Sequence, residues 1–138
     1  MQFKVRDWMI DLVVMVEPDL PVTEVLATMR RRYIHSVIVN KSAENPEYGI
    51  ITSTDICDKI VAAGRNPARI KAAEIMSSPI ITVSPEMKID ECAKLMSEKS
   101  IHHLPVADKA GNVIGMISAT DFLVVAEAMG RDGDRSMS

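Results

Sequence analysis

The sequence predicts an α/β (α+β) fold, in which two β-α-β-β-α repeats pack sheet to sheet with pseudo-twofold symmetry. The chain of 138 residues repeats itself: residues 5–40 align with 72–107, and 49–64 with 115–130, with 14 identities over these 52 positions. Each copy also holds two short apolar runs of strand length and two stretches with helical spacing. Because a half of roughly 65 residues would bury too little surface alone, we expect the two copies to share one core.

The elements of each repeat follow the same order. A short extended segment near residues 14–16 or 81–83 comes first, and a helix follows after Pro18 or Pro85. Its apolar residues recur at the i, i+3, i+4, i+7 spacing of an amphipathic helix. They are Val22, Val25, Leu26 and Met29 in the first copy and Ile89, Cys92, Ala93 and Met96 in the second.

Two short strands and a second helix complete each repeat. The strands lean toward β-branched residues. They cover residues 37–39 and 49–51 in the first copy and residues 104–106 and 113–117 in the second. The final helix begins at about Asp55 or Asp121 and ends near Gly64 or Gly130, because glycine suits a helix C-terminus.

The duplication divides the chain into a first repeat, residues 5–64, and a second repeat, residues 72–130. Residues 65–71 link the two repeats, and a short helix is expected after Pro67. The polar segment 131–138 is expected to be a flexible tail.

The composition excludes several classes of function. The net charge is −3, from 19 acidic and 16 basic residues, so the chain has no general attraction to nucleic acid. The longest early apolar run, residues 12–16, is too short to cross a bilayer, and the first residues lack the apolar core of a secretion signal. The two cysteines, Cys57 and Cys92, form no C-x-x-C pair and indicate a reducing compartment. We expect a cytoplasmic protein with no nucleic-acid partner and no membrane partner.

A seven-residue pattern occurs twice, as GIITSTD at residues 49–55 and as GMISATD at residues 115–121. In each copy a hydroxyl ends a strand, and an aspartate lies in the first turn of a helix. The amide groups and the dipole at a helix N-terminus attract anions such as phosphate. The two acceptor oxygens of a carboxylate match the 2′ and 3′ hydroxyls of a ribose. A ribose phosphate would satisfy the whole set.

The same residue types are also preferred helix N-caps, and Thr-x-x-Asp is similar to a capping box with a shorter acid. A duplicated fold would duplicate its caps, so repetition alone does not decide between capping and ligand binding. His35, and His102 with His103, precede the first strand of each repeat, on the same edge as the motif. These imidazoles either face a phosphate or are surface residues. A zinc site is not expected, because no acid or cysteine follows them at ligand spacing.

The second copy resembles a CBS domain (the cystathionine-β-synthase type) over IMSSPIITVSPEMKIDECAKLMSEKSIHHLPVADKAGNVIGMISATDFL, and the first copy matches more loosely. The proline-bounded extended segment, the amphipathic helix, the H-x-h-P-V strand and the G-h-h-S-x-T-D motif are distinctive as a set. The likeness covers about residues 5 to 130, as a tandem pair called a Bateman module. It implies clefts between the repeats that bind adenosine-containing ligands such as AMP, ADP, ATP or S-adenosylmethionine.

The resemblance also implies which residues hold the ligand. The aspartates would hold ribose hydroxyls, the hydroxyl side chains would meet ribose or phosphate, and the histidines would lie near phosphate. Adenine would sit against the extended segments 13–15 and 80–82. The candidate ligand-binding residues are Ser118, Thr120, Asp121, His102, His103, Thr52, Thr54, Asp55, His35, Ile80 and Ile81. The cleft with Asp121 ranks first, because the first copy lacks a proline in its strand and has Ser36 in place of His103.

We therefore expect a non-catalytic regulatory module that senses an adenine nucleotide or S-adenosylmethionine, with no obligatory cofactor and no metal. The sequence shows no P-loop and no nucleophile–base pair in a recognisable context, so an enzyme is not expected. The alternative is a ligand-free interaction or scaffold module that dimerises or docks on a partner protein. The segment FLVVAEAMG is apolar on nearly every side, which favours burial against a second subunit, and the resemblance implies a homodimer through such helices. The sequence does not identify the regulated protein.

Overall fold

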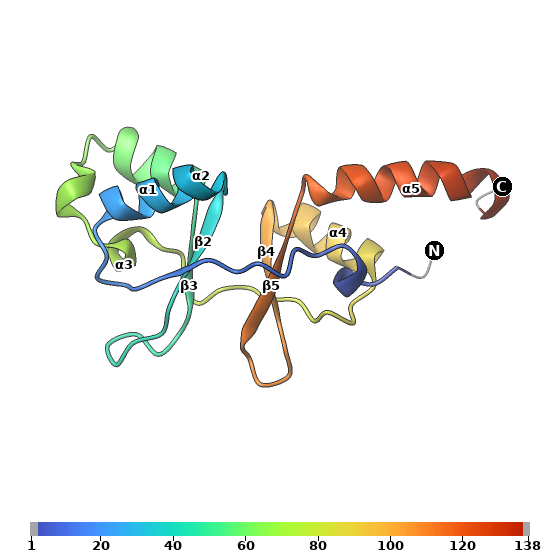
Figure 1. Ribbon diagram of the computed structural model, residues 1–138, viewed down its shortest axis with the longest axis horizontal. Helices are drawn as coiled ribbons and strands as arrows, with labels where there is room; N and C mark the ends of the chain where they lie inside the picture. Colours follow the sequence, from blue (N-terminus) through green and yellow to red (C-terminus); the bar gives the residue numbers. More distant parts are fainter. Residues whose placement is uncertain (1–2, 137–138) are drawn as a thin grey trace. The chain divides into compact units, whose positions relative to one another are not determined.

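The computed structural model describes residues 3–136, with side chains through residue 131 (Figure 1). The chain forms two compact units, and each unit combines segments from both repeats. Unit 1 contains residues 3–13 and 81–136, and unit 2 contains residues 14–80. Each unit is a small sheet with helices packed against it, which confirms the predicted mixed α+β class.

Unit 2 is built on a three-stranded sheet in the order β1-β2-β3. Strand β1 runs parallel to β2, and β2 runs antiparallel to β3. Helix α1 packs against β2, and α3 packs against β3. The bounds are β1 Met15–Val16, α1 Val22–Arg32, β2 Ser36–Val39, β3 Gly49–Thr52, α2 Ser53–Ile56, η2 Cys57–Val61, η3 Pro67–Arg69 and α3 Ala72–Ile75.

Unit 1 is built on the antiparallel pair β4 and β5. Single bridges extend this pair on both sides, from Ile10 to Met116 and from Val83 to Val106. The extended segment predicted at residues 81–83 is therefore one bridge rather than a strand. The bounds are η1 Val5–Asp7, α4 Ile89–Lys99, β4 His103–Ala107, β5 Val113–Ser118 and α5 Asp121–Ser136.

The short helix that opens each repeat packs into the core of the other repeat's sheet. Val5 of η1 is fully buried in the core of unit 1, and Ile75 of α3 is fully buried in the core of unit 2. Equivalent hydrogen bonds hold the two helices: the amide of Val5 donates to the carbonyl of Met87 at 2.9 Å, and the amide of Ala72 donates to the carbonyl of Leu20 at 2.8 Å. Each core is therefore completed by a segment from the other end of the duplication.

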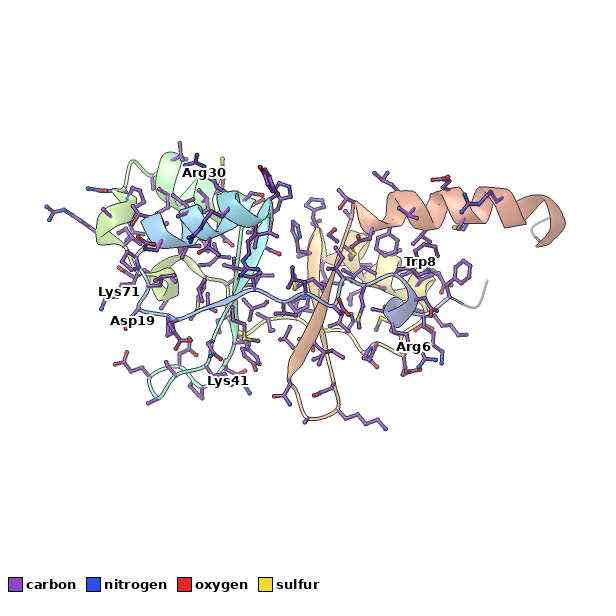
Figure 2. The ribbon with its side chains drawn as sticks, viewed as in Figure 1. Arg6, Trp8, Asp19, Arg30, Lys41 and Lys71 are labelled. Atoms are coloured by element: carbon purple, nitrogen blue, oxygen red, sulfur yellow. The ribbon has the colours of Figure 1, made fainter. Side chains whose placement is uncertain are left out.

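Charged residues lie on the exposed side of η1. Arg6, labelled in Figure 2, lies 2.8 Å from Glu86, and Lys4 contacts the same carboxylate at 2.8 Å. Trp8, also labelled in Figure 2, meets Phe3 edge to face with ring centroids 5.3 Å apart. Alternation of apolar and charged residues thus places a three-residue helix against the core with its charges outward.

The helices that close the repeats differ from the prediction. In the first repeat the α-helix lasts from Ser53 to Ile56 and continues as one π-helical segment through Val61. The helix ends at Val61, and a turn then leads to Gly64, the residue near which the end was predicted. There the backbone has φ +67°, and the amide of Arg65 donates to the carbonyl of Ile60 at 3.0 Å.

In the second repeat the closing helix does not end at Gly130. Helix α5 passes through this residue and continues to Ser136, beyond the predicted boundary. An internal glycine costs a helix only about 1 kcal/mol, and an ion pair between Glu127 and Arg131 at 3.1 Å supports the turn that contains it. The flexibility of the tail 131–138 stays a prediction, and residues 137–138 lie outside the described residues. Among the helices of the described chain, none is long and apolar enough to span a bilayer.

Candidate functional site

The first motif forms a tight hydrogen-bonded junction between β3 and α2. Thr52 is the last residue of β3 and precedes the helix, so its amide has no partner from a preceding turn. Oδ2 of Asp55 accepts a hydrogen bond from this amide at 2.9 Å and a second from the Thr52 hydroxyl at 3.3 Å. The amide of Ser53 donates to the carbonyl of His35 at 3.1 Å, which ties the helix start to the preceding strand. Asp55 therefore caps its own helix, as the capping interpretation predicts.

The second motif repeats this geometry at the junction between β5 and α5. Oδ2 of Asp121 accepts from the amide of Ser118 at 2.7 Å and from its hydroxyl at 3.2 Å. The amide of Ala119 donates to the carbonyl of His102 at 2.9 Å. The hydroxyl of Ser118 also lies 2.8 Å from that of Thr120. Three predicted site residues of the second repeat, Ser118, Thr120 and Asp121, are thus in direct contact.

The two aspartates differ at their other carboxylate oxygen. Oδ1 of Asp55 lies 2.9 Å from Nζ of Lys59, four residues further along the helix. The same ammonium donates to the carbonyl of Ile75 at 2.8 Å. Asp55 is 9% exposed, and among the residues that the structure describes no other charged residue is buried. In the second repeat the position of Lys59 is taken by Val125, which is buried in the core of unit 1.

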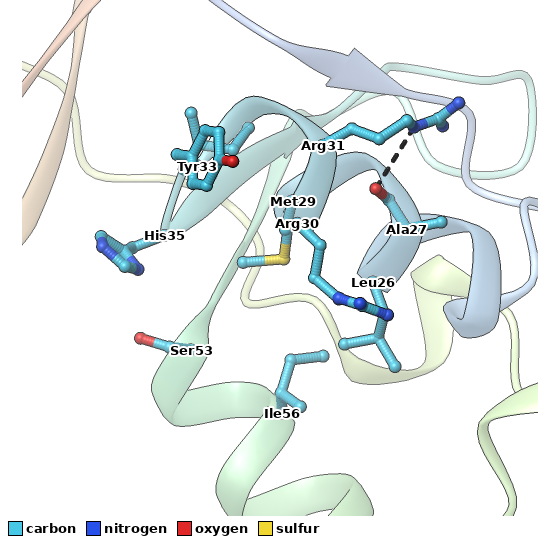
Figure 3. Close-up of a pocket in the computed structure, with 10 residues that line it drawn as sticks. Leu26, Ala27, Met29, Arg30, Arg31, Tyr33, His35, Ser53 and Ile56 are labelled. Atoms are coloured by element: carbon cyan, nitrogen blue, oxygen red, sulfur yellow. Dashed lines mark hydrogen bonds between the residues drawn. The ribbon is translucent and has the colours of Figure 1, made fainter.

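A pocket lies beside the first motif, between the end of α1 and the start of α2 (Figure 3). It has a volume of about 840 Å³, and apolar side chains such as Met29 and Ile56 line it. Arg30 and the exposed Tyr33 stand at its rim, and His35 and Ser53 lie together on one side. The pocket therefore combines an apolar wall with polar and cationic groups, which is typical of a small-molecule or partner site.

The equivalent pocket occurs in the second repeat with a volume of about 540 Å³. Met96 and Phe122 form its apolar wall, and His102 lies at its edge. Its rim has Ser97 and Ser100 where the first repeat has the arginine and the tyrosine, so it has lost both the charge and the ring. Both repeats therefore have a pocket at the same position, and the two pockets differ in volume and in lining residues.

The predicted site residues fall into two groups within each unit. The lining of the first pocket includes His35, and that of the second includes His102, but neither lining includes the motif aspartate. His103 lies in β4 directly opposite Ser118, which places it nearer to the second motif. Thr54 is exposed on α2. Ile80 is the last residue of unit 2, and Ile81 begins the second segment of unit 1. The role of both residues toward adenine stays a prediction.

Lys59 is one of four functional candidates that the sequence did not indicate. A signal was present, since an acid and a lysine four residues apart on a helix are spaced to form an ion pair. Its contact with the carbonyl of Ile75 could not be predicted, because it depends on the exchange of the short helices between repeats. Arg30, Tyr33 and Ser53 were missed for a similar reason: the pocket that they line forms only when two helix ends meet.

Comparison with known proteins identifies the family that shares this architecture. A family model for the CBS domain matches residues 5–62 and 72–127. MK0525, an uncharacterized protein of Methanopyrus kandleri, is 39% identical over 108 residues, which make up 78% of this chain and 55% of that protein. The chain therefore spans about half the length of this curated relative.

Two solved structures show the same fold. The hexameric CBS-CP12 protein from bloom-forming cyanobacteria has a TM-score of 0.85 and 28% identity, covering 97% of this chain and 76% of that chain. The CBS domain pair of protein MJ0100, in complex with 5′-methylthioadenosine and S-adenosyl-L-methionine, has a TM-score of 0.80 and 22% identity, covering 93% of this chain and 98% of that chain. With both repeats matched by the family and the paired fold shared with these structures, the chain belongs to the CBS domain family as a tandem CBS pair.

Proposed function

We propose that this chain is a non-catalytic regulatory module that binds an adenosine-containing ligand, such as AMP, ADP, ATP or S-adenosylmethionine. The observation that carries the proposal is the cluster of Ser118, Thr120 and Asp121 at the start of α5. The amide of Ser118 fixes Oδ2 of Asp121 at 2.7 Å, so the carboxylate is oriented before any ligand arrives. A carboxylate held in one orientation binds a ribose diol without losing side-chain freedom on binding.

The other groups of the second repeat have complementary roles in this proposal. Ser118 and Thr120 supply a pair of hydroxyls beside the carboxylate, suited to ribose or phosphate oxygens. The sixteen-residue helix α5 begins at Asp121, and the positive end of its dipole favours a phosphate nearby. His102 and His103 are the proposed imidazole contacts to phosphate. These groups position a ligand and supply no activated nucleophile, which is why the role is regulatory.

Two observations support the ligand class. The CBS pair of MJ0100 was solved with 5′-methylthioadenosine and S-adenosyl-L-methionine, and both compounds contain adenosine. The second observation is the grouping of two hydroxyls with a carboxylate at the start of α5, where the hydroxyl of Ser118 contacts both Thr120 and Asp121. At Asp121 the cap engages Oδ2, and the proposal assigns Oδ1 to the ligand.

A thermal-shift panel of AMP, ADP, ATP, NAD and S-adenosylmethionine tests the proposal. A ligand at 100 times its Kd should stabilise the protein by about 2.7 kcal/mol through mass action. Asp121→Asn is the matched variant, because an amide oxygen can still accept from Ser118 while the second acceptor oxygen is lost. We expect this variant to keep most of its own stability and to lose the ligand-induced shift. If no compound on the panel shifts the melting temperature, the scaffold alternative replaces this function.

The proposal includes a homodimer and a separate regulated protein. Three apolar side chains of α5 are exposed in the single chain: Leu123 at 72%, Val124 at 51% and Met129 at 38%. Exposed apolar side chains on one helix favour a second subunit, and a partner that prefers the ligand-bound form would respond by thermodynamic coupling. The two unpaired thiols, exposed Cys57 and buried Cys92, support the cytoplasm as the proposed compartment.

Sedimentation of purified protein tests the dimer. Leu123→Lys should shift the mass toward the monomer, because it places a charge in the apolar contact. Ala110→Lys, in the exposed loop between β4 and β5, adds the same charge away from the helix and should leave the mass unchanged. If both variants sediment with the same mass, α5 is not part of the dimer interface.

A further inference from the structure

The carboxylate of Asp55 is more heavily occupied than that of Asp121. A carboxylate offers about four lone-pair directions for hydrogen-bond donors. At Asp55 the amide and hydroxyl of Thr52 use Oδ2, and the ammonium of Lys59 uses Oδ1 at 2.9 Å. Three donors therefore converge on this group before any ligand binds. A ribose diol needs two acceptor positions, so it must displace one of them.

Lys59 is held in place from a second side. Its ammonium also donates to the carbonyl of Ile75, at 2.8 Å, at the end of α3. The side chain of Asp55 is 12% exposed and that of Lys59 is 39% exposed, so the pair is partly shielded from water. Two acceptors and partial burial distinguish this contact from a loose surface ion pair, whose median contribution is only about 0–1 kcal/mol.

The second repeat has no lysine at the position equivalent to Lys59. Val125 occupies the position of Lys59 and points into the core of unit 1, where it is 3% exposed. Ser118 contacts Asp121 through Oδ2, the same oxygen that caps the helix. The side chain of Asp121 is also more exposed than that of Asp55. The two copies of the motif are therefore unequal in what a ligand must displace.

We propose that Lys59 is a built-in competitor for the ligand at Asp55, which makes the chain bind one equivalent of an adenosine-containing ligand, at Asp121. This inference rests on the proposed function and assigns to Lys59 a specificity role that acts through Asp55. Displacing a partly shielded ion pair that has a second acceptor weakens binding at Asp55 by roughly tenfold, which corresponds to about 1.4 kcal/mol.

Isothermal titration with AMP and with S-adenosylmethionine tests the inference on the chain of 138 residues. The wild-type protein should bind one equivalent with high affinity. Lys59→Met keeps the length of the side chain and removes the charge, and it should bind a second equivalent. This gain opposes the simple electrostatic expectation, since loss of a cation should weaken binding of an anion such as AMP. Lys59→Arg keeps the charge and should restore the single equivalent.

A double variant assigns the new equivalent to a site. Lys59→Met combined with Asp121→Asn should bind one equivalent, and adding Asp55→Asn should abolish it. Far-ultraviolet circular dichroism and the melting temperature establish that each variant is folded. Two equal equivalents in the wild-type protein, or an unchanged stoichiometry in folded Lys59→Met, would overturn the role of Lys59 while leaving the proposed function intact. Absence of binding in every folded form would instead reject the proposed function.

Discussion

The two repeats build the same junction and then diverge one helical turn later. In both, a strand ends on a hydroxyl residue whose amide is capped by an aspartate three residues on, at 2.9 Å for Asp55 and 2.7 Å for Asp121. Four residues further, the first repeat has Lys59 paired with the carboxylate, and the second has Val125 in the core. The cap is therefore common to both repeats, whereas the charge around it differs between them.

The largest expected effect comes from Ile75→Ala. Ile75 belongs to the second repeat but is fully buried in the core of unit 2, beside strands of the first repeat. Truncating a buried isoleucine to alanine costs about 2–5 kcal/mol. Amide hydrogen exchange should show lost protection in β2 and β3, with α4, β4 and β5 nearly unchanged. Loss confined to the second repeat's own strands would contradict the exchange of short helices.

A comparison of two glycines sharpens this contrast. A Cβ at Gly115 would meet the carbonyl oxygen of Ile10 at 2.8 Å, and Ile10 is bridged to β5 through its own amide and carbonyl. A Cβ at Gly49 would meet the side chain of Met76, which can move. We expect Gly115→Ala to cost about 2–3 kcal/mol and Gly49→Ala about 1–2 kcal/mol in urea unfolding.

A second substitution should restore part of the stability that Gly49→Ala loses. Met76→Ala removes the side chain that the new methyl group would strike, so it should recover part of the stability lost in Gly49→Ala. Met9→Ala should not rescue Gly115→Ala to the same degree, because the backbone of Ile10 remains in place. Equal rescue at both sites would show that side chains, and not the backbone bridge, set the cost.

Removing the two aspartates separately should give unequal losses of stability. Asp121→Ala loses a helix cap, which costs about 1 kcal/mol. Asp55→Ala loses the same cap and also leaves Lys59 without its carboxylate, so the cost should be greater by about 0.5–1 kcal/mol after allowing for solvent screening of the half-exposed lysine. A double-mutant cycle with Lys59→Met measures this coupling directly. A coupling energy near zero would make the ion pair incidental.

The smallest effect is a change in stability at alkaline pH, and it depends on a residue that differs between α4 and α1. Burial raises the pKa of Cys92 in α4 to about 11, and the first repeat has Val25 at the corresponding position of α1. Between about pH 9 and 11 the unfolded thiol ionises while the folded thiol stays neutral, so the free energy of unfolding falls as the pH rises. Cys92→Val should flatten this dependence, with unfolding followed through Trp8, the single tryptophan of the chain, which lies in unit 1. An identical pH dependence in both proteins would exclude Cys92 as its source.

Much of the fold followed from local pattern. The strands at 36–39, 49–52, 103–107 and 113–118 and the helices at 22–32 and 89–99 lie within a few residues of their predictions, because each has a strong apolar period or a β-branched run. The helix starts at the two motifs were also predictable, since a hydroxyl followed three residues later by an acid is a capping signal. These features depend on contacts close together in the sequence.

The features that were not predicted depend on distant contacts or on weak signals. The exchange of η1 and α3 requires a hydrogen bond between residues such as Val5 and Met87, which no local pattern reveals. Gly130 was assigned as a helix end because glycine often ends helices, yet here the helix tolerates it. The pockets beside His35 and His102 arise where two helix ends meet, so their lining became visible only in the folded chain.

The exchange of the opening helices has a consequence for how the chain folds during synthesis. Residues 3–13 leave the ribosome before residues 81–136, which supply the strands that cover Val5. The N-terminal segment must therefore wait, unburied, until the strands of unit 1 have emerged, whereas unit 2 is complete once residue 80 is free. Such an order of events favours early formation of the unit that contains the Asp55–Lys59 pair, and the unit that contains the proposed ligand site closes after it.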